Sequence, residues 1–73
     1  MDKVVIFFTK HVALVGRPIP GSKKLRLINV VQNDYTNDEN IKQLKEQYEG
    51  FYDEVEIRDM RGEDPRHLDE KGR

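Results

Sequence analysis

The sequence lacks cysteine and tryptophan altogether, and it has no long apolar run. Without cysteine, a chain of this size has neither a disulfide framework nor a thiolate zinc site to stabilise it. The longest apolar run, VVIFF at positions 4–8, is far short of the roughly 20 residues that span a bilayer. Asp2 precedes that run at a place where a signal peptide carries only basic charge. We therefore expect one small domain of thin stability, located in the cytoplasm.

Side chains that perform catalysis are equally scarce. Ser22 is the only serine, and no histidine lies near it in the sequence. The two histidines, His11 and His67, are not spaced as a pair of metal ligands or catalytic groups. We therefore expect a protein that is not an enzyme and that needs no cofactor.

Carboxylates are plentiful, and four near the end of the domain could in principle bind a hard metal ion: Asp53, Glu54, Glu56 and Asp59. They lack the regular spacing and the glycine of a calcium loop. Along a strand, Glu54 and Glu56 also face away from the other two carboxylates. The pattern favours a solvated acidic edge, and no metal site is predicted.

The stretch GRPIPGSK at positions 16–23 resembles a phosphate-binding loop, because its two glycines are separated by four residues and followed by serine and lysine. The order of the last two residues is exchanged, and Pro18 and Pro20 remove two N–H donors that would line a phosphate cradle. Residues 24–32 then have the period of a strand, where the motif requires a helix. We interpret residues 16–22 as the connection of a hairpin.

The N-terminal part of the chain predicts β-structure. Lys3–Phe8 is continuous, β-branched and aromatic, which is typical of a strand buried on both faces and therefore central in its sheet. A second apolar run, His11–Val15, is separated from it only by Thr9 and Lys10, which are poor residues for a two-residue hairpin. We favour one long strand bent by a bulge here, and two strands joined by an irregular turn are the alternative.

A helix is predicted between Thr36 and Gly50. Thr36 can cap its start with Glu39 completing a capping box, and Gly50 is placed for a left-handed C-terminal residue. The apolar stripe of this helix consists of Ile41, Leu44 and Tyr48. Because the stripe is narrow, we expect the helix to lie on the sheet.

A last strand is predicted over residues 52–59. Val55 and Ile57, together with Phe51, point to the core, whereas the outward side carries Glu54, Glu56 and Arg58. We thus predict an α+β domain at residues 1–60 in the order ββαβ, with one helix packed on a three- or four-stranded sheet. The helical connection makes the strands on either side of it parallel if they share the sheet. Residues 61–73 are expected to be a disordered charged tail.

Charge is distributed unevenly along the chain. Residues 1–32 carry six Lys or Arg against one Asp, whereas residues 33–60 carry three basic residues against nine acidic ones. Such asymmetry predicts two electrostatic faces if the fold keeps the two parts of the chain apart, and the alternative is that the two parts neutralise each other across the fold. The candidate binding residues are Arg17, Lys23, Lys24 and Arg26 on the basic side, and Glu49, Asp53, Glu54, Glu56 and Arg58 on the other.

The scarcity of catalytic side chains and the uneven distribution of charge favour a small regulatory protein that docks on a larger macromolecule. In size, and in its lack of cysteine and cofactor motifs, the chain resembles the host-directed regulators of bacteriophages. That resemblance implies a partner such as host RNA polymerase and a role as an inhibitor in transcription regulation. The alternative is a nucleic-acid-binding module that uses the basic hairpin at residues 17–26. A homodimer is also open, because an interface can offset thin stability.

Overall fold

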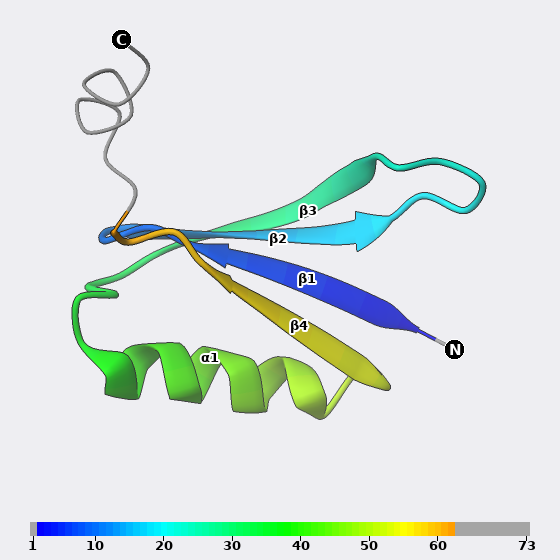
Figure 1. Cartoon of the computed structure of the whole chain (residues 1–73). Helices are drawn as coiled ribbons and strands as arrows, with labels where there is room; N and C mark the ends of the chain where they lie inside the picture. The colour runs from blue at the N-terminus through cyan, green and yellow to red at the C-terminus, as the bar shows by residue number, and fades with distance from the viewer. Residues whose placement is uncertain (1, 63–73) are drawn as a thin grey trace, which may run out of the picture.

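The structure is a computed structural model that describes residues 2–62, in which four strands form one sheet and one helix covers one of its faces (Figure 1). Along the chain the elements are β1 (Lys3–Phe8), β2 (Val12–Pro18), β3 (Leu25–Gln32), α1 (Asp38–Glu49) and β4 (Glu54–Asp59). The α+β class with a helix on a four-stranded sheet is confirmed. Most of the predicted tail, residues 63–73, lies outside the described part of the chain.

The strand order is β3-β2-β1-β4, so β1 is an interior strand, as its continuous apolar sequence predicts. It pairs antiparallel with β2 and parallel with β4, and β2 pairs antiparallel with β3. The strands β3 and β4 therefore run in the same direction at opposite edges of the sheet, joined by the crossover through α1. The parallel arrangement expected for these two strands is confirmed.

The favoured interpretation of residues 3–15 as one bent strand is wrong, because β1 and β2 are separate antiparallel strands. The hydroxyl of Thr9 closes the turn between them. It accepts from the N–H of Val12 at 3.1 Å and donates to the carbonyl of the same residue at 3.0 Å, while the Thr9 N–H donates to that carbonyl at 2.9 Å. The chain reverses here without a positive φ angle, which is why the usual turn residues are absent.

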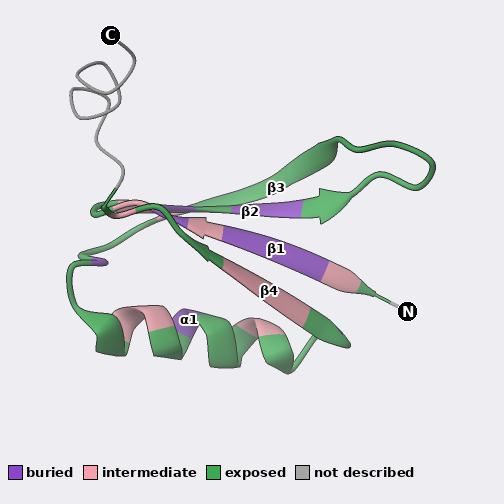
Figure 2. Cartoon of the chain, viewed as in Figure 1, coloured by how far each residue is buried: buried purple, intermediate pink, exposed green. Residues whose placement is uncertain are grey.

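The core lies between the helix and one face of the sheet, and its buried residues gather on β1 and β2 (Figure 2). Its members with little or no exposure are Val4, Ile6, Phe8, Ala13, Val15, Tyr35 and Leu44. Tyr35, in the loop before α1, meets Phe8 edge to face with ring centroids 4.9 Å apart. Val55 and Ile57 of β4 pack against this cluster, as predicted.

Helix α1 begins and ends differently from the prediction. Asn37 is the N-cap, and its side-chain oxygen accepts from the N–H of Glu39 at 2.9 Å. Thr36 does not cap, because its hydroxyl and N–H both donate to the carboxylate of Asp34. Gly50 has φ −75° and ψ −14°, so it is right-handed and not left-handed. With twelve residues, α1 is too short to cross a membrane, and the described residues contain no other helix that could do so.

The predicted inward position of Phe51 is wrong, since 76% of its surface is exposed. It lies in the turn after α1, before β4 begins at Glu54 rather than at residue 52. Tyr52 takes the inward position instead and stacks on Tyr48 of the helix at 6.1 Å between centroids. At the start of the strand, Asp53 and Glu54 both donate their N–H groups to the carbonyl of Asp2.

Arg61, which the sequence analysis assigned to the tail, fastens the end of β4 to the start of the helix. Its guanidinium donates to the carbonyl of Tyr35 at 2.9 Å and to the carboxylates of Asp38 and Asp59 at 2.7 Å each. The fork of donors on the guanidinium holds the pKa of Asp59 at about 2, well below its ordinary value of 3.8. Side-chain contacts of the fold therefore extend one residue beyond Met60.

Candidate interaction surface

The β2–β3 hairpin ends in a tight turn formed by Ile19, Pro20, Gly21 and Ser22. The Ser22 N–H donates to the Ile19 carbonyl at 3.1 Å, and Gly21 has a φ of +76°. Proline followed by a glycine of positive φ is the signature of a type II turn. A strand follows this turn, as the sequence analysis predicts, and the helix that a phosphate-binding loop requires is not there.

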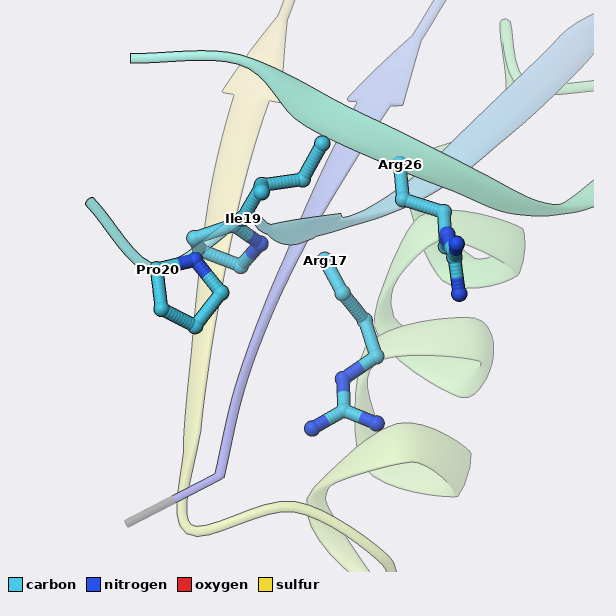
Figure 3. A pocket seen from close by; sticks show the side chains of 5 residues that line it. Arg17, Ile19, Pro20 and Arg26 are labelled. Atoms are coloured by element: carbon cyan, nitrogen blue, oxygen red, sulfur yellow. The ribbon is translucent and has the colours of Figure 1, made fainter. Parts of the chain in front are cut away.

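Below the turn, two arginines line a shallow cavity of about 360 Å³ together with Pro18, Ile19 and Pro20. Arg17 is on β2 and Arg26 is on β3, and the two are directly opposite each other in the ladder. Their side chains extend in the same direction, toward the side of the sheet that carries α1 (Figure 3). The predicted basic residues of the two strands are therefore brought together.

Like charges placed directly opposite in a sheet destabilise the pair. Arg17 is partly compensated, because it donates to the carboxylate of Asp2 at 3.3 Å and lies 5.5 Å from the ring centroid of Tyr52. Arg26 is exposed and forms no ion pair within residues 2–62. The cavity thus carries a positive charge that the described part of the chain leaves unneutralised.

The remaining basic candidates, Lys23 and Lys24, lie in the connection just beyond the turn. Both are exposed, and neither forms a salt bridge with another described residue. The Lys24 N–H donates to the hydroxyl of Ser22 at 3.0 Å, and its carbonyl accepts from Ile19, so the backbone of this tip is well defined. The hairpin tip therefore presents its lysines from a fixed backbone.

On β4, by contrast, the acidic candidates are paired inside the molecule. Lys3 of the neighbouring strand contacts Glu54 at 3.7 Å and Glu56 at 3.0 Å, and Arg58 contacts Glu56 at 2.6 Å. These cations, Arg58 first and then Lys3, lower the pKa of Glu56, and Glu56 in turn raises the pKa of Lys3. The β4 carboxylates therefore present much less net charge than the sequence indicates.

The other two acidic candidates are also engaged. Glu49 pairs with Lys45 one helical turn earlier at 3.7 Å. Asp53 accepts from the N–H of Asp2 at 3.0 Å. Arg26 on β3 and the carboxylates of β4 are at opposite edges of the sheet and do not form one site, whereas Arg17 on β2 and Asp53 both contact Asp2.

Sequence reasoning missed an apolar surface on and beside the hairpin. Its exposed members are Leu14, Ile19, Leu25, Leu27, Ile28 and Val30. Simple alternation does not give the faces of β3, because Val15 is opposite Asn29 while Gly16 is opposite Leu27, so that Ile28 is an extra residue. A bulge of this kind cannot be recognised from the alternation of apolar and polar residues in the sequence. The one available signal was Ile19, an isoleucine between two prolines in a loop.

Comparison with known proteins adds no identification to this geometry. No protein-family model, curated protein or solved structure gives a match to the chain.

Proposed function

We propose that this protein is a non-enzymatic binding protein that docks on a larger protein by inserting an acidic group of that protein between Arg17 and Arg26. The observation that carries the proposal is the placement of these two arginines, which are paired across the ladder and line one cavity. A carboxylate between them removes the repulsion and accepts hydrogen bonds from planar donors, which is the geometry that arginine recognises best.

A protein partner is favoured over nucleic acid by the apolar residues next to the basic ones. Ile19, of which 38% is exposed, and the flanking prolines line the same cavity as the arginines. Protein interfaces combine apolar contacts with arginine, whereas interfaces with nucleic acid are more polar and much more positive. Lys23 and Lys24 at the tip then attract the partner at longer range, which raises the rate of association.

The first experiment is affinity capture of the tagged protein from a bacterial lysate, with and without nuclease, read by mass spectrometry. The proposal expects one stoichiometric protein that survives nuclease, and RNA polymerase is the first candidate to test directly with purified components. Recovery that depends on nucleic acid would instead support the alternative module that reads phosphate backbones with residues 17–26.

Variants of the hairpin sharpen this test. Arg26→Gln is expected to abolish capture while keeping or slightly raising thermal stability, because it removes a like-charge pair. Lys23→Gln with Lys24→Gln is expected to weaken capture and its dependence on salt. The matched control is Lys42→Gln with Lys45→Gln on α1, which removes the same charge elsewhere. Equal capture by all three variants would refute docking through the hairpin.

A further inference from the structure

The outer edge of β3 is the least protected part of the sheet. Seven of its eight residues are exposed, and Arg26 is its only charged residue. The opposite edge, β4, carries charges at alternate positions, which is how sheets discourage pairing with another chain. A long edge strand rich in leucine, isoleucine and valine lacks that protection.

The backbone groups that β3 offers to a further strand follow from its hydrogen bonds to β2. At one end the Asn33 N–H donates to the His11 carbonyl at 3.1 Å, and at the other the Ile19 N–H donates to the Lys24 carbonyl at 3.0 Å. Bonded and non-bonded positions alternate along an antiparallel ladder, except at the bulge at Ile28. The positions whose N–H and C=O groups point outward are therefore Leu25, Leu27, Val30 and Gln32.

These four outward positions match those of a second copy of β3 that runs antiparallel to the first. Leu27 then faces Val30 of the second copy, and Leu25 faces the second copy's Gln32, so that every outward position meets another. The three-residue step from Leu27 to Val30, which the bulge produces, is matched by the same step in the other strand. A partner strand without this bulge does not fit all four positions.

Side chains and charges agree with the same register. Leu27 and Val30 are both on the face of the sheet away from α1, so each makes an apolar contact with the other in the second copy. Arg26 faces Val31 of the second copy, so no like charges meet. Among residues 2–62, the Val30 N–H donates to the side-chain oxygen of its neighbour Asn29, at 2.9 Å, and would gain a backbone carbonyl.

We infer that the protein forms a homodimer through antiparallel pairing of β3 with β3 of a second copy, in the register that joins Leu27 to Val30. The two sheets become one continuous sheet with both α1 helices on the same face. Arg26 of the proposed docking site lies within this interface, on the face that carries α1, whereas residues 19–24 at the hairpin tip lie outside it. The inference is argued from the edge of β3 alone, so it goes beyond the proposed function and stands without it.

Sedimentation velocity across micromolar to millimolar concentrations tests the state of the native chain, and two double variants test the register. Leu27→Lys with Val30→Lys places lysine against lysine twice and is expected to weaken the dimer about tenfold or more. Leu27→Lys with Val30→Glu removes the same apolar groups but places lysine against glutamate twice. This second variant is expected to remain a dimer, with an affinity that falls as salt is added.

A native chain that stays monomeric throughout this range would overturn the inference, as would equal dimerisation of the two double variants. Circular dichroism establishes that both variants fold. Should either unfold, isotope-filtered NOE spectroscopy on a mixture of labelled and unlabelled native protein decides the question. Contacts between the Leu27 and Val30 methyl groups of different chains are then expected, and their absence in a dimer would refute this register.

Discussion

Tyr35 and Phe51 provide a sharp test of the fold, because the sequence predicts an inward position for Phe51 and makes no prediction for Tyr35. Tyr35 has 1% of its surface exposed and packs edge to face on Phe8, whereas Phe51 has 76% exposed. Replacing a buried aromatic residue by alanine costs about 3–5 kcal/mol, because transfer and cavity contributions add. A domain of 73 residues is typically stabilised by only about 4–11 kcal/mol in total.

Tyr35→Ala is therefore expected to remove a large part of the free energy of unfolding, and Phe51→Ala is expected to change it by no more than about 0.5 kcal/mol. Urea unfolding followed by far-UV circular dichroism measures both, at one low protein concentration so that association does not contribute. Tyr35→Phe is the control, since it keeps the ring in place. The packing described here would be refuted if Phe51→Ala destabilised the protein as much as Tyr35→Ala.

Three further substitutions address the cap, the turn and the ion cluster. Asn37→Ala should lower the free energy of unfolding by about 0.5–2 kcal/mol in urea melts, because it leaves the Glu39 N–H without its partner. Gly21→Ala should cost about 1–2 kcal/mol in the same assay, since alanine must adopt a φ of +76°. Arg61→Met should return the pKa of Asp59 from about 2 toward its ordinary 3.8, as followed by carboxyl carbon NMR. A lowered pKa stabilises the fold above about pH 4 and loses this effect as pH falls through 2, so native protein should lose more stability than Arg61→Met over that range.

The sequence predicted β1 and α1 correctly because the burial of each element produces a pattern of apolar residues within that element. Lys3–Phe8 is apolar at nearly every position, as expected of an interior strand flanked by β2 and β4. Val4, Ile6 and Phe8 are buried in the core, and Val5 between them is also only 3% exposed. The apolar stripe at Ile41, Leu44 and Tyr48 likewise predicts the face of α1 that meets the sheet. Both predictions depend on a repeat that can be read within one element.

Predictions failed at the turn after β1 and at the start of α1, where the hydrogen bonds of particular side chains determine the local structure. The turn at Thr9 is closed by a hydroxyl, and the helix start is capped by Asn37 while Thr36 binds Asp34. Several caps are compatible with one stretch that contains Asn, Asp and Thr, and tertiary contacts choose among them. Tyr35 belongs to no periodic element, so nothing in the sequence marks it as part of the core.

The candidate site was predicted in part. Arg17 and Arg26 were named because both are basic and bracket the turn, but their placement opposite each other follows from the hairpin turn, which pairs Ile19 with Lys24. The acidic residues were overrated for a related reason. Counting charges along the chain cannot show that Lys3 of β1 lies next to Glu56, since parallel pairing of the first and last strands creates that contact.

The arrangement of the sheet separates stability from recognition. Buried side chains lie mainly on β1, β2 and the helix side, whereas β3 is exposed on both faces and its hairpin extends beyond the core (Figure 2). A two-stranded ribbon is only marginally stable by itself. Because the apolar side chains of β3 are mostly exposed, this strand contributes little to the folding of the isolated chain. Its leucines and valines are therefore better suited to contacts that form on association. It follows that substitutions at Leu27 or Arg26 should alter binding more than folding, and that the reverse should hold for Tyr35.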